Sequence, residues 1–277
     1  MKNISLKQSY FIFGIIAVHV VFFLLTMHYK KLYMGDSYEH VYMALNIKEH
    51  FLFYSANAAL PLQAKYFTLR PPVYSLFLLL VYFFTVNNWI VLIVQNILSI
   101  FNILYFRKTI RTIGYDKKYD WVLLLFLVMY PAQFIYANTI APDLLLQSFV
   151  LIYCSNFLLL FKNKQPRYAW MMSTALVLGM FTKPILYPFV VVHIVILVWL
   201  CLRYSVRRKS LISLLLPIGC ILLYNTWNME RTGKFHFTSI QPLNAMYYNV
   251  RMYKEQTEGY SVAKEFMTNE KRIMEHQ

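Results

Sequence analysis

The side chains of this 277-residue chain that are best suited to chemistry lie in a short acidic loop. The loop reads Gly35-Asp36-Ser37-Tyr38-Glu39-His40 and follows an apolar segment. A carboxylate at such a place can accept a proton from a hydroxyl nucleophile, so Asp36 is a candidate general base with Glu39 and His40 beside it. An Asp three residues before a Glu is also typical of a helix capping box. The two interpretations are compatible, because a capped helix start is a rigid place for a catalytic group.

A lone cation lies in one of the later apolar stretches. Lys183 is the only charged residue between Tyr168 and Leu202. An ionisable group in a segment of this kind indicates a functional site by default. The competing interpretation is that the long side chain only extends to the lipid headgroups. Both interpretations stay open at the level of the sequence.

Two further charged residues join the set of candidates. Asp143 follows Pro142 at the start of an apolar segment, where an acidic residue also stabilises a helix N-terminus through the helix dipole. Arg70 precedes Pro71-Pro72. A guanidinium is suited to bidentate contact with a phosphate, either of a lipid or of a substrate.

Composition indicates the elements that must position these residues. Hydrophobic residues make up 59% of the chain and charged residues only 14%, and apolar runs of near-bilayer length recur throughout. Because a spanning helix needs about 20 apolar residues, the sequence predicts an all-α, polytopic membrane helix bundle of about seven spans. The predicted spans are 9–27, 88–106, 121–138, 143–161, 168–182, 185–202 and 210–227.

The stretch 71–87 is a marginal eighth candidate. As a helix it would cover about 25 Å, short of the ~30 Å hydrocarbon core. If it does not cross, every strongly basic segment falls on one side of the membrane, as the positive-inside rule requires of the cytoplasmic side. We therefore expect 71–87 to be a juxtamembrane or re-entrant helix on the outer face. The basic segments are the N-terminus before 9 and the loops 107–118, 162–167 and 203–209.

This topology places the candidate residues on one outer face. The loop 28–87, the turn 138–143, the turn 182–184 and the chain from 228 onward all lie there. We expect residues 1–227 to form the bundle and residues 228–277 to form an outer-face polar tail, the start of a C-terminal region that continues beyond this chain. Within the tail, Tyr260–Glu275 is typical of a solvated amphipathic helix.

The net charge of the chain and the polar residues within its predicted spans are both explained by structure. The net charge of +15 is explained by topology and by anionic lipid headgroups, so no nucleic-acid partner is expected. Polar residues inside the predicted spans are expected to make interhelical hydrogen bonds. These residues are His19, Gln95, Asn96, Asn102, Gln147, Asn156 and His193.

Metal binding has little support in the sequence. The three cysteines, Cys154, Cys201 and Cys220, fall inside predicted spans and are expected to pack there. No cofactor is expected, although a divalent ion is an open alternative. Its ligands would be Asp36, Glu39 or Asp143.

The order of these motifs resembles that of a known group of enzymes. Gly35-Asp36-Ser37-Tyr38, Arg70-Pro71-Pro72-Val73-Tyr74, Tyr136 to Asp143 and Thr182-Lys183-Pro184 occur in turn on the expected outer face. Asn225 through Phe235 and Asn244 through Asn249 follow the last span. The pattern resembles glycosyltransferases of the C superfold, and most closely family 39, which includes protein mannosyltransferases and lipid A aminoarabinose transferases.

The resemblance implies a role for each residue. Asp36 corresponds to the acidic residue of the first outer loop, which in such enzymes serves as the catalytic base or organises the acceptor. Glu39 lies beside it as a further catalytic candidate, and Asp143 corresponds to a second acidic position. Arg70 and Lys183 correspond to cations near the phosphate of a lipid-linked donor. Tyr38 and His40 lie in the same acidic loop and are expected to contact substrate, and Arg231 is a weaker candidate for the phosphate.

The reaction implied is an inverting transfer of a sugar. The donor would be a polyprenyl-phosphate sugar, the acceptor a hydroxyl of a lipid, glycan or protein, and the location the bacterial inner membrane with the active face outside the cytoplasm. No nucleotide is implied, and the sequence has no Gly-rich phosphate loop.

Two alternatives from other classes stay open. One is a truncated, non-catalytic relative that acts as a membrane assembly partner or a lipid carrier. Transporters place binding groups near the bilayer midplane, whereas the charges here are expected at one surface, which favours an enzyme. The other is an outer-leaflet ligase that moves a whole glycan.

Overall fold

The computed structural model describes residues 6–204, 206–240, 249–262 and 264–265. Every regular element in these ranges is helical, and the only β-pairing is one isolated bridge. Four helices of the described chain are long and apolar enough to cross a membrane, which agrees with the predicted all-helical, membrane-type architecture. They cover Tyr10–Tyr29, Asn88–Arg111, Asp143–Asn163 and Arg208–Thr232.

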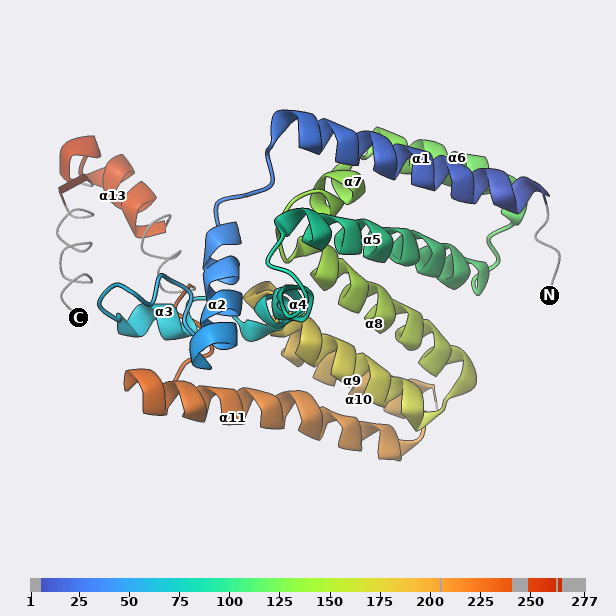
Figure 1. Cartoon of the computed structure of the whole chain (residues 1–277). Helices are drawn as coiled ribbons and strands as arrows, with labels where there is room; N and C mark the ends of the chain where they lie inside the picture. The colour runs from blue at the N-terminus through green and yellow to red at the C-terminus, as the bar shows by residue number, and fades with distance from the viewer. Residues whose placement is uncertain (1–5, 205, 241–248, 263, 266–277) are drawn as a thin grey trace.

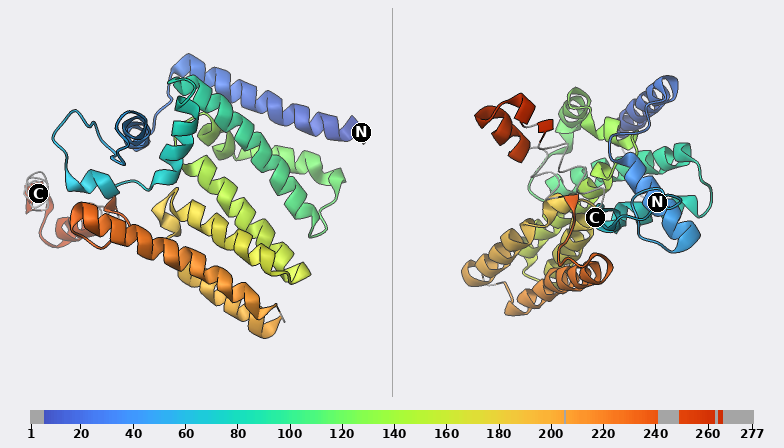
Figure 2. Two further views of the ribbon diagram at one scale, coloured as in Figure 1. Left: turned by 60° about the horizontal axis from the view of Figure 1, so that its bottom comes forward. Right: turned by 90° about the vertical axis from the view of Figure 1, so that its left-hand side faces the viewer.

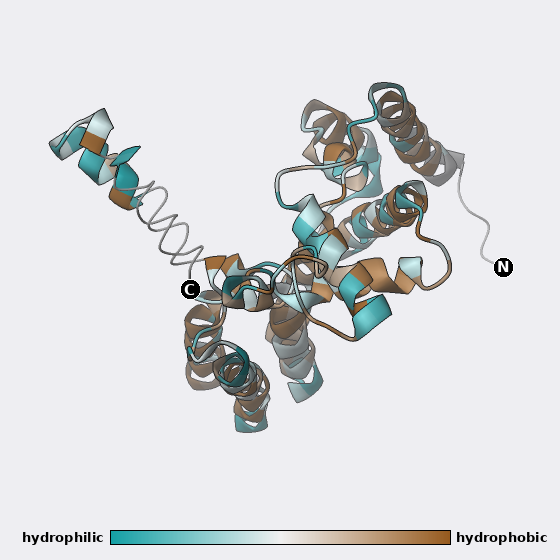
Figure 3. Cartoon of the chain, turned by 60° about the vertical axis from the view of Figure 1, so that its left-hand side comes forward, coloured by the Kyte–Doolittle hydropathy of each residue, from teal (hydrophilic) through white to brown (hydrophobic). Residues whose placement is uncertain are grey.

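The predicted spans correspond to helices of unequal length. The long helices are α1 (Leu6–Tyr29), α5 (Asn88–Arg111), α8 (Asp143–Asn163) and α11 (Leu215–Thr232), the last preceded by the 3-10 helix η3 (Arg208–Leu214). Shorter helices are α9 (Pro166–Met180) and α10 (Phe189–Arg203), which follows η2 (Pro184–Leu186). Figure 3 shows that these helices are predominantly hydrophobic, whereas α13 (Arg251–Thr257) is mostly hydrophilic.

One predicted span is wrong as a continuous helix. The stretch 121–138 is divided into α6 (Asp120–Met129) and α7 (Ala132–Ala137), after the short η1 (Lys117–Tyr119). The break falls at Pro131, which has no N–H and disfavours a helical conformation of the residue before it. Tyr130 accordingly leaves the helical region, with φ −114° and ψ 77°.

The basic loops share one end of the bundle, as predicted. The start of α1, the end of α5, the α8–α9 turn and the α10–α11 connection lie together at the right of Figure 1, and Figure 2 agrees. We call this the basic end. The opposite end, the loop end, comprises residues 28–87, 138–142, 181–188 and 233–240, and it carries α2 (Ser37–His50), α3 (Ala64–Thr68) and α4 (Pro72–Tyr82).

The marginal segment 71–87 stays at the loop end. Its helix α4 has 11 residues and is about 16 Å long. Near its start, Val73 N–H donates to Phe181 O at 3.0 Å. At its other end, Lys48 Nζ donates to Tyr82 O at 2.7 Å. Both ends of α4 therefore contact loop-end segments, which confirms that this stretch does not run the length of the bundle.

Buried polar side chains connect the helices. His19 of α1 lies 2.8 Å from Ser99 Oγ of α5. His193 of α10 lies 2.9 Å from both the Tyr153 hydroxyl of α8 and Ser173 Oγ of α9. These contacts confirm the expected interhelical role of the histidines; Asn156 differs, because its amide bonds within its own helix to Ile152.

The polar tail is only partly described. The predicted helix Tyr260–Glu275 is helical at 260–262 and 264–265, and the rest of it lies outside the described residues. Most of the segment Asn244–Asn249 lies outside them as well.

Candidate active site

The first loop is joined to the turn before α8. Ile140 N–H donates to Leu32 O at 2.8 Å, and Tyr33 and Ile140 form the isolated parallel bridge. Ser37 Oγ donates to Ile140 O and accepts the Met34 N–H at 2.7 Å. The start of α2, which carries the acidic loop, is thereby held beside the turn that leads to Asp143.

A buried glutamine fixes this turn to α4 and α5. Gln95 Nε2 donates to Tyr136 O at 3.0 Å and to Thr139 O at 2.8 Å. Gln95 Oε1 accepts the Tyr74 hydroxyl at 3.0 Å. Gln95 therefore holds α4 and the turn before Asp143 against α5. The sequence indicated only an interhelical hydrogen bond for this residue.

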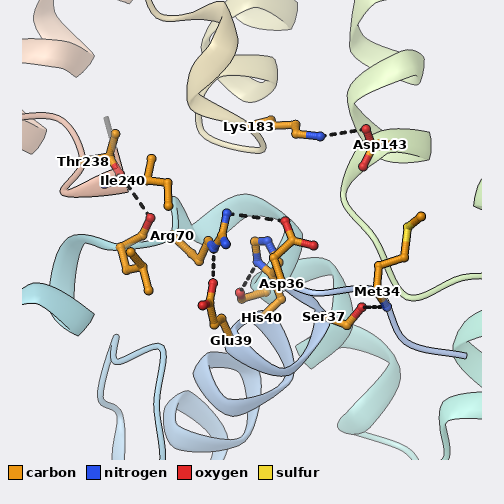
Figure 4. Close-up of polar contacts among 12 residues, drawn as sticks. Met34, Asp36, Ser37, Glu39, His40, Arg70, Asp143, Lys183, Thr238 and Ile240 are labelled. Atoms are coloured by element: carbon orange, nitrogen blue, oxygen red, sulfur yellow. Dashed lines mark hydrogen bonds and ion pairs between the residues drawn. The ribbon is translucent and has the colours of Figure 1, made fainter. Parts of the chain in front are cut away.

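Arg70 contacts both carboxylates of the acidic loop. Its Nε donates directly to Glu39 Oε2, and its Nη1 lies 3.4 Å from Asp36 Oδ2 (Figure 4). The three side chains are 16%, 29% and 25% exposed for Arg70, Glu39 and Asp36. These residues are 31 and 34 positions apart in the chain, so the pairing is a product of the fold.

The prediction that the Asp36 side chain caps a helix is wrong. Asp36 does occupy the N-cap position of α2, but its side chain makes no capping hydrogen bond. The Glu39 side chain is bonded to Arg70 and so is directed to the site. Neither carboxylate therefore caps α2 in this structure.

A second pair lies across from the first. Lys183 Nζ donates to Asp143 Oδ1 at 2.8 Å, and the two side chains are 34% and 27% exposed (Figure 4). Lys183 follows α9, and Asp143 is the first residue of α8. The Lys183 ammonium therefore contacts a carboxylate of the protein. The alternative interpretation, in which the side chain extends to the lipid headgroups, does not describe this conformation.

Electrostatic effects place the two pairs in one neighbourhood. Burial, with smaller contributions from the charges of Arg70 and Lys183, lowers the pKa of His40 to about 3. Burial raises the pKa of Tyr74, and both Asp36 and Asp143 add to that shift. The cations thus act on a common histidine and the carboxylates on a common tyrosine.

His40 is buried and faces the protein interior. Its Nδ1 lies 3.3 Å from Ser75 Oγ, and its ring meets the Tyr74 ring edge-on at 5.0 Å. Its low pKa keeps the ring neutral near pH 7. In this structure His40 packs α2 against α4, and the expectation that it contacts substrate stays a prediction.

Asp36 and Glu39 differ in their freedom to react. Burial raises the pKa of Glu39, the Asp36 charge adds to the rise, and Arg70 opposes it. Glu39 is bonded directly to Arg70, whereas Asp36 makes only the longer 3.4 Å contact. Figure 4 shows the second Asp36 oxygen directed away from Arg70. Asp36 is the better placed of the two to accept a proton.

Two predicted site residues lie outside this cluster. Tyr38 is exposed and stacks on Tyr33, with ring centroids 4.6 Å apart. Arg231 lies over the Trp227 ring, 3.4 Å from its centroid, and donates to Asn228 Oδ1. The structure thus brings together Asp36, Glu39, Arg70, Asp143 and Lys183.

Each carboxylate of the cluster contacts a cation: Asp36 and Glu39 share Arg70, and Asp143 contacts Lys183. In the described part of the chain, no group of three or more His, Cys, Asp and Glu side chains is arranged to hold a metal ion. The alternative of a divalent ion at Asp36, Glu39 or Asp143 stays open.

Comparison with protein-family models, with curated proteins and with solved structures finds no match to this chain. The resemblance to glycosyltransferases of the C superfold therefore stays a prediction, carried by the motifs and their placement.

Proposed function

We propose that this chain is a membrane glycosyltransferase that moves a sugar from a polyprenyl-phosphate donor to a hydroxyl acceptor. The observation that carries the proposal is the cluster at the loop end. Carboxylates and cations from four separate segments meet there, at one end of an apolar helix bundle. A lipid-linked substrate needs such a site, because its chain stays in the bilayer while its phosphate and sugar lie at the surface.

The bundle would cross the membrane along its long helices. The positive-inside rule then puts the basic end in the cytoplasm and the loop end outside. The resemblance of the tail to bacterial members of the family favours a bacterial inner membrane, although an endoplasmic reticulum membrane would obey the same rule. The helices α9 and α10 have 15 residues each, about 22 Å. Short spans of this kind are accommodated by local thinning of the bilayer.

Transfer would proceed by a single displacement. Asp36 takes the proton of the acceptor hydroxyl, and the freed oxygen forms a bond to the anomeric carbon of the sugar. The bond from that carbon to the phosphate oxygen breaks, and the polyprenyl phosphate leaves with the electron pair. Attack opposite to the leaving group inverts the configuration. A lipid, a glycan or a protein would supply the hydroxyl.

The cations would stabilise the leaving phosphate. Lys183 and Arg70 provide positive charge where negative charge develops, which is usually a large contribution to catalysis. The five side chains carry three negative and two positive charges when all are ionised, so the phosphate would be repelled. A proton on Glu39 would remove this excess and free part of Arg70, and burial already favours that proton.

The test is a transfer assay in native lipid with a panel of polyprenyl-phosphate sugars. Asp36→Asn keeps the side-chain shape but cannot act as a base, so we expect transfer to fall by about 100-fold or more. The matched control is Asp116→Asn, a carboxylate at the basic end whose Lys118 partner is also exposed; it should retain transfer.

The donor arm uses Lys183→Ala. We expect weaker use of the donor, seen as a higher donor KM together with a lower kcat, because the ammonium would act on the phosphate in both states. Full transfer by Asp36→Asn would remove Asp36 as the base. If the folded chain transfers no sugar from any donor of the panel, the result would instead favour a non-catalytic membrane protein.

A further inference from the structure

The loop end holds a second group of cations, apart from the carboxylate cluster. It forms where the end of α11, the segment 233–240 and α3 meet. Asn228 Nδ2 donates to His236 O at 2.8 Å and to Phe237 O at 3.2 Å. Thr68 Oγ1 lies 2.9 Å from His236 Nε2. These bonds fix the three elements to one another.

Arg231 is the centre of this group. Its guanidinium lies 3.4 Å from the centroid of the Trp227 ring and is held by Asn228 Oδ1. The Tyr224 hydroxyl is also beside it. Its Nε is buried without a hydrogen-bond partner among the described residues. Packing and hydrogen bonds thus set the orientation of the guanidinium before any ligand arrives.

Two lysines lie on the segments that meet the end of α11, and the Nζ of Lys65 lies 5.2 Å from the centroid of the Tyr66 ring. Lys65 lies one helical turn before Thr68 on α3, and the Lys65 carbonyl accepts the Ser239 hydroxyl at 2.9 Å. Lys234 is exposed, and its carbonyl accepts the His236 Nδ1 proton at 2.9 Å. Burial lowers the pKa of His236, and the charges of Lys234 and Arg231 lower it further, so these cations are within electrostatic reach of it.

No carboxylate balances this charge in the part of the chain that the structure describes. Arg70 is paired with Asp36 and Glu39, and Arg107 with Asp120. Arg231, Lys65 and Lys234 form no ion pair with any described residue. Of the undescribed stretches, 241–248 contains no Asp or Glu, and 266–277 contains Glu270 and Glu275. A half-buried guanidinium fixed in place without an anion is a binding group for one.

We propose that Arg231, Lys65 and Lys234 form an anion-binding site for a phosphate group, separate from the Arg70–Lys183 cluster. Arginine presents a planar fork that matches two phosphate oxygens, and Lys65 and Lys234 would add point charges. A phosphate monoester of a lipid headgroup or of a soluble compound has this chemistry. The site does not depend on sugar transfer, because it is defined by binding.

The experiment measures phosphate binding to the full chain in phosphatidylcholine nanodiscs by titration calorimetry. One arm uses inorganic phosphate, and the other uses dihexanoyl phosphatidic acid with dihexanoyl phosphatidylcholine as its neutral reference. Arg231→Gln should weaken binding by about tenfold or more. Lys65→Gln should weaken it by roughly threefold. The matched control Arg203→Gln, an exposed arginine at the basic end, should bind as the unaltered chain does.

The two arms separate the sources of the phosphate. Binding of phosphatidic acid that far exceeds binding of inorganic phosphate identifies a lipid headgroup, and equal binding identifies the phosphate group alone. The proposal is overturned if the unaltered chain binds neither compound. It is also overturned if Arg231→Gln and Lys65→Gln, both shown to be folded by circular dichroism, bind as tightly as Arg203→Gln.

Discussion

Arg107 at the basic end and Arg70 at the loop end are both paired with carboxylates, but the two pairs are built differently. Arg107 binds Asp120 through two bonds, Nε to Oδ1 at 2.9 Å and Nη2 to Oδ2. Its guanidinium also lies 4.6 Å from the centroid of the Phe11 ring. The two charged side chains are only 4% and 12% exposed. This pair links α5 to the start of α6 and is almost completely buried.

Arg70 is held more loosely and by residues farther away in the chain. Its contact with Asp36 is 3.4 Å long, and its partners are about a quarter exposed. An arginine–carboxylate pair is therefore not by itself a sign of function. A closed, bidentate pair between consecutive helices stabilises the fold, whereas an open pair between distant segments leaves oxygens available for chemistry.

The first prediction separates the two pairs by stability. Asp120→Asn should lower the free energy of unfolding by about 3 kcal/mol, because it leaves the buried Arg107 without its counter-charge. Asp36→Asn should cost clearly less, since Arg70 keeps Glu39. Denaturant unfolding in detergent, followed by circular dichroism, measures both.

Asp116→Asn is the matched control for Asp120→Asn. Asp116 lies four residues earlier in the same connection, but its side chain is exposed, so little change is expected. Equal losses for Asp120→Asn and Asp36→Asn would show that the open pair is as structural as the closed one. The contrast between the two ends would then fail.

The sequence predicted the placement of the site better than its detailed contacts. Hydropathy and charge were sufficient to place the basic loops at one end and to keep 71–87 from crossing, since both depend on sums over many residues. The same argument placed Asp36, Arg70, Asp143 and Lys183 on one face. Their pairing was not predicted, because it depends on how α2, α4, α8 and α9 pack.

The errors have local causes. Pro131 divides a segment whose hydropathy alone is typical of one span. Asp36 has the spacing of a capping residue, but Arg70, 34 positions later, competes for its carboxylate. Gln95 carries no sequence signal beyond being polar in an apolar helix, and its role appears only when its three partners are seen together.

The second prediction concerns pH and the loop end. The pKa of His40 is about 3 in the folded chain against 6.5 in the unfolded chain. Below pH 6.5 the unfolded chain therefore binds a proton that the folded chain does not. Stability should fall as the pH drops from 6.5 toward 3, by at most about 1.4 kcal/mol per pH unit from this group. His40→Asn should remove this part of the slope.

Two controls keep the pH measurement specific. His28→Asn, at an exposed position near the end of α1, should leave the slope unchanged. Glu39 acts in the opposite direction, because its raised pKa makes the folded chain hold a proton more tightly than the unfolded chain as the pH falls. A steeper slope in Glu39→Gln would confirm this sign. An unchanged slope in His40→Asn would show that the histidine is hydrated and not buried.

The last prediction tests how open the second pair is. A double-mutant cycle of Lys183→Met and Asp143→Asn should give a coupling free energy of only about 0.5 kcal/mol, because both side chains are close to one third exposed and solvent screens their attraction. The same cycle on Arg107→Met and Asp120→Asn should give several times more. A coupling at Lys183–Asp143 as large as that of the closed pair would mean that the ammonium is committed to the fold and is not free to meet a phosphate.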